Sequence, residues 1–162
     1  DVAGPEGPAV EGVTVRYLTP HNKWSIHAEY QDNLFMLSLS RGGQNIWMSD
    51  KDAAKVGVED NDWIEAVNRN GVVVARAIVS HRMPEGTVYM HHAQDRLIDV
   101  PSAETSGKRG GIHDSLPRLL VKPSHLIGGY AQLTWAHNYI GPTGNQRDEV
   151  TVIRRRSQDV EY

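Results

Sequence analysis

The stretch from Ser49 to Gly86 constrains the fold more than any other part of the chain, because capping and turn-forming residues divide it into short elements. Ser49 is a favourable N-cap, and Asp52 follows at the position from which a capping carboxylate reaches back. Gly57 can then close the helix in a left-handed conformation. We therefore predict a helix of about two turns that begins after Ser49.

Two strands follow this helix. The alternation from Trp63 to Asn68 and the apolar run from Val72 to Ser80 are both typical of strands, and the Asn-Arg-Asn-Gly sequence at 68–71 favours a tight reversal between them. Pro84 and Gly86 end the second strand. A short helix inserted between the strands of a small, β-rich chain resembles the double-psi β-barrel, the architecture of aspartate decarboxylase. We therefore expect a mainly β fold with short helices.

The remaining elements are weaker predictions. Strands are expected at Val13–Leu18, Leu34–Ser40, Gln44–Met48, Thr87–His92 and Glu149–Arg155. Proline and glycine interrupt residues 95–123 too often for regular structure, which predicts a long loop that is functional or closes over something. A short helix is expected within 124–138. The Gly- and Pro-rich residues 1–12 are typical of a linker from a longer protein, and 13–162 form one domain.

Composition excludes several classes of function. The chain has 162 residues and a net charge of −3, so no overall positive field would attract nucleic acid. It has no cysteine and therefore cannot hold an iron–sulfur cluster through thiolate. No apolar run reaches the roughly 20 residues of a membrane span. The histidines lack the cysteine or carboxylate spacing of a metal site, so no metal ligand is expected.

Ring-bearing and polar side chains are concentrated between Thr19 and Ala28, directly after the first predicted strand. This segment contains His21, Trp24 and His27. It could be a surface loop that its aromatic residue attaches to the core. It could equally be a platform for a planar heterocycle carrying phosphates, because imidazole and indole rings stack while backbone N–H groups bind anionic oxygens.

Several separated segments resemble one family in the same order. They are TPHNKWSIHAEYQDN, IWMSDKDAAKVGVEDNDWIEAVNRNG, KRGGIHDS, HLIGGYAQL and GPTGNQRDE. Together they are similar to the C-terminal molybdopterin-dinucleotide-binding domain of respiratory nitrate reductase alpha subunits. The resemblance implies a domain that closes over a bis-molybdopterin guanine dinucleotide cofactor, in a subunit that reduces nitrate to nitrite in anaerobic respiration.

The resemblance also implies which residues contact the cofactor. In the first segment, the residues placed against the pterin or its pyrophosphate are Thr19, His21, Ile26, His27 and Ala28. His21 and His27 would form hydrogen bonds to the pterin, and Trp24 would shape the wall of the site. No catalytic residue is expected in this chain, because the molybdenum would be held by the pterin dithiolenes and by a residue elsewhere.

Two later segments add further candidates. Gly111 and His113 match a glycine-rich approach in which small residues let the backbone come close to the ligand. Asp114 stands where an asparagine is expected, and an ionised carboxylate can only accept a hydrogen bond. Gln146 and Arg147 match another contact segment. Arg147 could bind phosphate or form an ion pair with Asp148.

The same resemblance implies partners and a location. The domain would belong to a longer alpha subunit with a 4Fe-4S cluster outside this chain, together with an iron–sulfur beta subunit and a membrane gamma subunit, at the cytoplasmic face of the membrane. The alternative is a stand-alone double-psi barrel used as a binding or adaptor module. A decarboxylase of this architecture is set aside, because its pyruvoyl group arises at a Gly-Ser bond and no Gly-Ser dipeptide occurs here.

Overall fold

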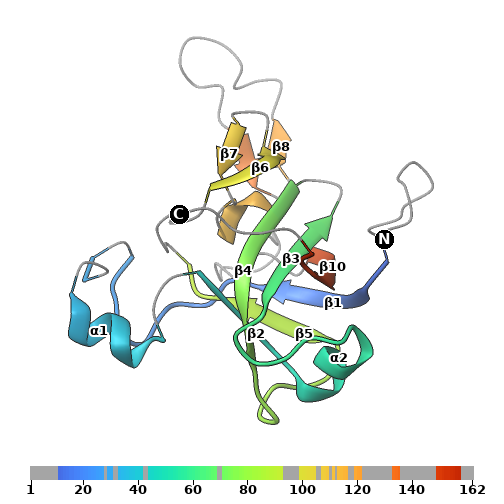
Figure 1. Ribbon diagram of the computed structural model, residues 1–162. Helices are drawn as coiled ribbons and strands as arrows, with labels where there is room; N and C mark the ends of the chain where they lie inside the picture. Colours follow the sequence, from blue (N-terminus) through green and yellow to red (C-terminus); the bar gives the residue numbers. More distant parts are fainter. Residues whose placement is uncertain are drawn as a thin grey trace, which may run out of the picture.

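A closed β-barrel forms the centre of the molecule. The computed structural model describes residues 11–27, 29–30, 33–41, 44–68, 71–92, 99–104, 107–109, 111, 113–116, 119–121, 133–135 and 149–157. Within these residues the barrel strands follow the order β1-β10-β3-β4-β2-β5 (Figure 1). Their bounds are β1 Val13–Leu18, β2 Asn45–Met48, β3 Trp63–Asn68, β4 Gly71–Val79, β5 Thr87–Met90 and β10 Glu149–Arg155.

The barrel combines parallel and antiparallel neighbours. β1 runs parallel to β5, and β2 runs parallel to β4, whereas the other neighbouring pairs are antiparallel. Parallel neighbours require crossover connections, so the chain passes over the barrel instead of following a simple meander. This is the predicted double-psi β-barrel, and the predicted mainly β fold with short helices is confirmed.

The core lies inside the barrel, as the alternation of the strands requires. In β3, Ile64 and Ala66 are fully buried, and in β5 Val88 and Met90 are fully buried. Intervening residues such as Trp63 and Tyr89 point to the outer surface and are half-buried. Leu116 also belongs to the core although it lies outside the barrel strands.

The predicted helix after Ser49 is α2 (Asp50–Lys55), and Gly57 has the expected left-handed conformation, with φ of 64°. Ser49 accepts a hydrogen bond from the Asp52 N–H at 3.0 Å and donates its hydroxyl to the Asp52 carboxylate at 2.8 Å. The same carboxylate accepts a hydrogen bond from the Gly86 N–H at 2.6 Å. The helix cap therefore also fixes the turn before β5.

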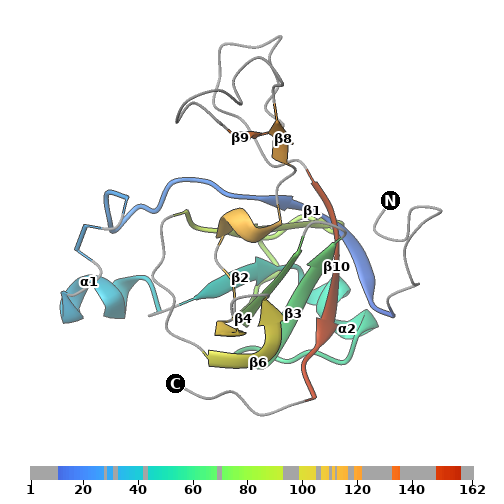
Figure 2. The same ribbon diagram turned by 90° about the horizontal axis from the view of Figure 1, so that it is seen from above.

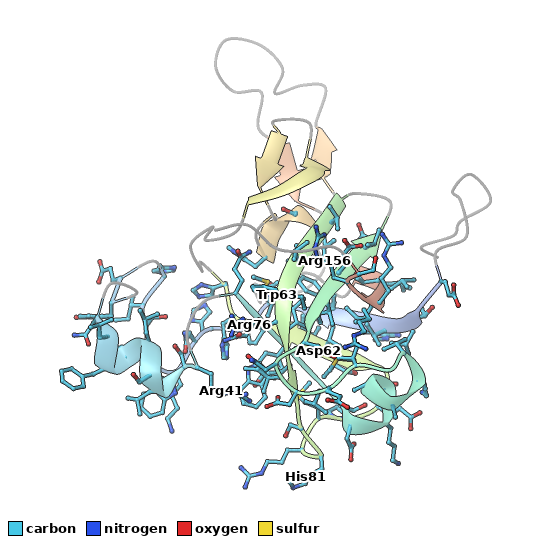
Figure 3. The ribbon with its side chains drawn as sticks, viewed as in Figure 1. Arg41, Asp62, Trp63, Arg76, His81 and Arg156 are labelled. Atoms are coloured by element: carbon cyan, nitrogen blue, oxygen red, sulfur yellow. The ribbon has the colours of Figure 1, made fainter. Side chains whose placement is uncertain are left out.

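Charged pairs join β3 to β10 on the outside of the barrel. Glu65 accepts hydrogen bonds from Arg154 at 2.7 Å and from Arg156 at 2.5 Å. Arg155 pairs with Asp62 at 3.3 Å, and Figure 3 labels Asp62 and Arg156 on this part of the molecule. The C-terminal arginines are thus bound to carboxylates in and next to the neighbouring strand.

The predicted strand at Leu34–Ser40 is wrong, because the structure forms helix α1 (Leu34–Leu39) there. The side chain of Asn33 accepts hydrogen bonds from the Phe35 and Met36 N–H groups at 3.0 and 3.3 Å, which is a typical N-cap. A short apolar run does not distinguish helix from strand, so the cap was the better signal.

The prediction of no regular structure across 95–123 is also wrong in part. This stretch contains β6 (Asp99–Glu104), β7 (Gly107–Arg109), the 3-10 turn η1 (His113–Ser115) and β8 (Leu119–Val121). β6 pairs with β7, and β8 pairs with β9 (Leu133–Trp135), in two small sheets. Within the helix predicted at 124–138, the described residues form β9 instead, and the others lie outside the described residues.

Candidate functional site

Four imidazole rings gather at one end of the barrel. The rings of His21 and His92 meet edge to face with centroids 4.3 Å apart, and those of His27 and His92 stack at 5.2 Å. His113 adds a fourth ring, 6.1 Å from His92. His92 and His113 are half-buried, whereas His21 and His27 are exposed. The cluster therefore presents a ring-lined, accessible surface, which we call the histidine mouth.

The direction of the strands explains why these rings meet. His21 and His27 follow β1, and His92 follows β5. Since β1 and β5 are parallel neighbours, their C-terminal ends lie at the same end of the barrel. The His92 N–H donates a hydrogen bond to the Pro20 carbonyl at 3.0 Å, which ties the two connections together.

Residues 111–116 close the same end of the barrel, and buried side chains hold them there. Gln44 Nε2 donates to the Gly111 carbonyl at 2.8 Å, and Asn68 Nδ2 donates to the Leu116 carbonyl at 2.7 Å. Between these points, the Tyr17 hydroxyl donates to the His113 carbonyl at 3.2 Å. Side chains in and next to the barrel strands thus fix the backbone on both sides of His113.

Close backbone packing supports residues 111–116, which we call the cap of the barrel. Gly111 has φ of 81°, and a Cβ there would meet the Val72 carbonyl oxygen. A Cβ on Gly71 would meet the Ser115 carbonyl oxygen. Leu116 is fully buried and packs into the core cluster beneath these contacts. Figure 2 shows η1 as the orange turn over the barrel strands.

Two hydroxyl groups near the histidine mouth have no hydrogen-bond partner among the described residues. They are the Oγ1 of Thr19 and the Oγ of Ser25, both buried. A buried hydroxyl without a partner is costly, so such groups in a native fold call for an explanation. Both belong to the connection that carries His21 and His27. Ligand atoms at this surface would provide the missing partners.

His27 adds a second sign of a functional surface. Its φ is 48°, a conformation that non-glycine residues adopt rarely and that clusters at functional sites. Next to the mouth, burial and the neighbouring His92 lower the pKa of His91. This shift favours the neutral form of the His91 imidazole.

Trp24 and Ile26 lie on the same connection but behave differently from the histidines. The backbone N–H of Trp24 donates to the Asn22 side chain at 2.9 Å, and the Lys23 ammonium lies 4.7 Å from the centroid of the Trp24 ring. The half-buried indole therefore holds a cation beside it. Ile26 is 58% exposed and takes part in an isolated bridge with Glu29.

The structure thus brings together several of the residues named from sequence. His21, His27 and His113 meet around His92, with Thr19 and Gly111 in the segments that carry them. Asp114 lies in η1, and its side chain is not described. Ala28, Gln146 and Arg147 lie outside the described residues, so their roles stay predictions.

Sequence reasoning missed His92, Ser25 and the three side chains that hold the cap. His92 was expected at the end of the strand Thr87–His92, whereas β5 ends at Met90 and leaves His92 in the connection that follows. Tyr17, Gln44 and Asn68 carried no signal in the sequence, since each is an ordinary residue at the end or start of a strand. Only the folded barrel shows that all three face residues 111–116.

The described residues contain no group of three or more His, Asp or Glu side chains arranged to hold a metal ion. Over the same part of the chain, no helix is both long enough and apolar enough to cross a membrane. The mouth instead combines stacking rings, ring nitrogens and two hydroxyl groups. These groups suit a planar, polar ligand.

Comparison with known proteins identifies the class. Residues 15–125 match the family described as Molydopterin dinucleotide binding domain. This match covers most of the chain, including most of β1, the strands β2 to β5 and all four rings of the mouth. The chain belongs to the molydopterin dinucleotide-binding domain family.

The curated relatives are much longer proteins. The chain is 68% identical to a nitrate reductase alpha subunit of Mycobacterium tuberculosis, over 93% of this chain and 12% of the relative. It is 57% identical to the nitrate reductase alpha chain of Bacillus subtilis, over 91% of this chain and 12% of that relative. It is 52% identical to the respiratory nitrate reductase 2 alpha chain of Escherichia coli, over 87% of this chain and 11% of that relative. The chain therefore spans about 12% of the length of these relatives.

A solved structure supports the fold. The acetylene hydratase of Pelobacter acetylenicus superposes with a TM-score of 0.55 over 88% of this chain and 18% of that protein, at 13% identity. At this identity the likeness concerns the fold alone. It agrees with the barrel described above.

Proposed function

We propose that this chain is the cofactor-binding domain of a nitrate reductase catalytic subunit, and that its histidine mouth contacts the pterin of a bis-molybdopterin guanine dinucleotide. The family match supports the class of ligand. The observation that carries the proposal to particular residues is the meeting of His21, His27, His92 and His113 beside two buried hydroxyls that have no partner among the described residues.

The chemistry of the mouth fits this ligand. A pterin is a planar heterocycle with hydrogen-bond donors and acceptors on its edge, and an imidazole can stack on its face or bond to its edge. His21 and His27 are both exposed, so both can reach the ligand directly. Thr19 and Ser25 would satisfy their hydroxyls on it. The family's second contact segment adds Gln146 and Arg147, with Arg147 suited to phosphate.

Each part of the mouth then has a defined task. His21 and His27 bind and orient the pterin edge, and His92 supports both rings by direct ring contact. Tyr17, Gln44 and Asn68 are positioning residues, because they set the backbone that carries His113. When bound, the cofactor supplies the molybdenum at which nitrate would be reduced. Hydrogen bonds from the mouth would tune the electronic properties of the pterin.

The activity and the assembly of the whole enzyme belong to the same proposal. The relatives' names support a subunit that reduces nitrate to nitrite, of which this chain is one part. Such a subunit would carry a 4Fe-4S cluster outside this chain. It would work with an iron–sulfur beta subunit and a membrane gamma subunit at the cytoplasmic face of the membrane.

Replacement of His21 or His27 by alanine in the full-length subunit tests the site. Neither side chain is buried, so the free energy of unfolding should change by less than about 1 kcal/mol. Losing one or two hydrogen bonds to the ligand should weaken cofactor retention by about 1–3 kcal/mol. The measurement is the molybdenum and guanine nucleotide content of the purified subunit, together with its thermal midpoint.

His81→Ala is the matched control. His81 is an exposed histidine on the turn after β4, which Figure 3 labels at the bottom of the view, and β4 ends at the barrel end opposite the mouth. Its replacement should leave the cofactor content unchanged. Full cofactor content in both His21→Ala and His27→Ala would show that the mouth does not hold the cofactor.

A further inference from the structure

Exposed apolar side chains are concentrated in one short part of the chain. Among the described residues, large hydrophobic side chains with high exposure are Ile26 at 58%, Tyr30 at 50%, Leu34 at 78%, Phe35 at 85%, Leu39 at 53% and Val150 at 36%. All but Val150 lie between residues 26 and 39. We call the described residues of this segment the apolar arm. Such a gathering of apolar surface marks an interaction site rather than a solvated surface.

Helix α1, which ends the arm, is not built to stand in water. None of its residues is buried, and its sequence LFMLSL contains no charged side chain. At 3.6 residues per turn, Leu34, Phe35 and Leu39 lie on one side of the helix, about 140° wide. A helix that is apolar all round is normally buried, and six residues are too few for a helix to be stable alone.

The structure nevertheless holds the arm in a definite place. Asn33 caps the start of α1, and just after its end Arg41 pairs with Asp60 at 2.7 Å. The hydrogen bond to Asp60 raises the pKa of Arg41, and the same contact lowers the pKa of Asp60. Figures 1 and 2 both show α1 standing away from the barrel strands. The arm is therefore anchored at its base and presented outward.

We propose that the apolar arm docks onto an apolar surface of the remaining catalytic subunit, an inference that rests on the proposed function. Residues 34–40 carry no charge, so the complementary surface is apolar rather than acidic or basic. The relatives place this chain within a polypeptide of which it forms 12%. The surface that covers the arm therefore belongs to the same polypeptide and is present at a fixed, high effective concentration.

Docking of the arm would also affect the histidine mouth. The arm begins at Ile26, directly beside His27, and leads to β2. Because the segment between β1 and β2 carries two histidines of the mouth as well as the arm, burial of α1 would hold His21 and His27 in place. The contact thus joins assembly of the subunit to the geometry of the cofactor site.

Cysteine labelling tests the proposal, because this chain contains no cysteine of its own. Phe35→Cys is introduced into the 162-residue chain and into the full-length holoenzyme, and the rate of maleimide modification of that peptide is measured by mass spectrometry. In the 162-residue chain the thiol should react as fast as that of His81→Cys, another exposed position. In the holoenzyme the thiol of Phe35→Cys should react at least about tenfold more slowly, and unfolding in guanidinium should restore the rate.

Two results would overturn the proposal. Equal labelling rates for Phe35→Cys in the 162-residue chain and in the native holoenzyme would show that the arm stays open. Protection that already appears in the 162-residue chain, rises with its concentration and accompanies a dimer in sedimentation would assign the arm to self-association. Leu34→Cys, at a position that is 78% exposed, provides a second site for both measurements.

The cofactor content of the same Phe35→Cys holoenzyme separates this proposal from the proposed function. Suppose that the Phe35→Cys holoenzyme is labelled rapidly and keeps its cofactor, while the His21→Ala holoenzyme loses its cofactor. This result would disprove docking of the arm and leave the proposed cofactor site intact. If instead the Phe35→Cys holoenzyme is labelled slowly and the His21→Ala holoenzyme keeps its full cofactor content, docking of the arm is supported and the proposed role of the histidine mouth is disproved.

Discussion

Asp52 shows how one residue can join several elements. Its carboxylate is fully buried and accepts hydrogen bonds from Ser49, from the Gly86 N–H and from Lys55 at 2.9 Å. Burial alone would raise the pKa of Asp52, but these hydrogen bonds and the Lys55 charge outweigh it and hold the pKa below its usual range. The ionised carboxylate therefore contributes to the stability of the fold.

We expect Asp52→Asn to destabilise the chain by about 1–3 kcal/mol at pH 7, because an amide offers one acceptor oxygen where the carboxylate offers two. A lowered carboxyl pKa contributes stability above the unfolded-state pKa of about 4, and that contribution disappears as the pH falls through the folded-state value. The difference in free energy of unfolding between the variant and the wild type should therefore shrink below about pH 4. Urea unfolding at a series of pH values measures this difference.

Asp50→Asn is the control, since Asp50 is exposed in the same first turn of α2. It should cost less than about 1 kcal/mol through the helix dipole. A pH-independent difference between Asp52→Asn and the wild type would contradict the proposed role of the charge.

The barrel and its cap depend on each other at the scale of elements. Strands β1, β3 and the segment before β2 each provide one buried side chain that binds residues 111–116, and Leu116 in turn fills the core. The cap therefore folds against the barrel and brings the His113 ring to the mouth. Its position depends on close backbone contact at Gly111.

Gly111→Ala should destabilise the fold by more than about 2 kcal/mol, because the alanine would combine a positive φ with a clash against the Val72 carbonyl. Gly57→Ala is the matched control. Gly57 also has a positive φ, at 64°, but no atom lies within 4 Å of a Cβ added there. It should therefore cost only about 1 kcal/mol. Thermal unfolding measures the loss of stability in each variant. Equal losses for Gly111→Ala and Gly57→Ala would show that the backbone around Gly111 shifts to accommodate the added Cβ.

Some elements were predictable and others were not, for a physical reason. The strand alternation at Trp63–Asn68 and the Ser49 cap are local signals, and both elements were predicted at nearly their observed bounds. The run at Leu34–Leu39 lacks a decisive period, and its Asn33 cap was overlooked. Strands β6 to β8 lie in a stretch broken by proline and glycine, where pairing with a neighbour decides the structure.

At the scale of the whole molecule, the chain matches a small part of much longer relatives. It spans about 12% of its relatives' length and contains no cysteine for an iron–sulfur cluster. Its exposed apolar arm and two histidines of the mouth lie on one connection, between β1 and β2. Both features are consistent with a domain that completes a site formed elsewhere in the polypeptide.

We therefore expect the purified 162-residue chain to have no nitrate reductase activity. The measurement is nitrite production with reduced viologen as the electron donor, and the full-length holoenzyme is the positive control. Turnover by the 162-residue chain without any added subunit would contradict its assignment as a cofactor-binding domain.

Local sequence determines the helix cap, the turns and the alternation of the barrel strands, because these depend on the conformational preferences of a few adjacent residues. The order of short segments from Thr19 to Glu149 indicates the family. The histidine mouth, by contrast, exists only in the folded barrel. His27 and His92 are far apart in sequence, and they stack because β1 and β5 pair in parallel. Likewise, only folding shows that α1 is left without a cover among the described residues, since burial depends on distant residues rather than on the segment itself.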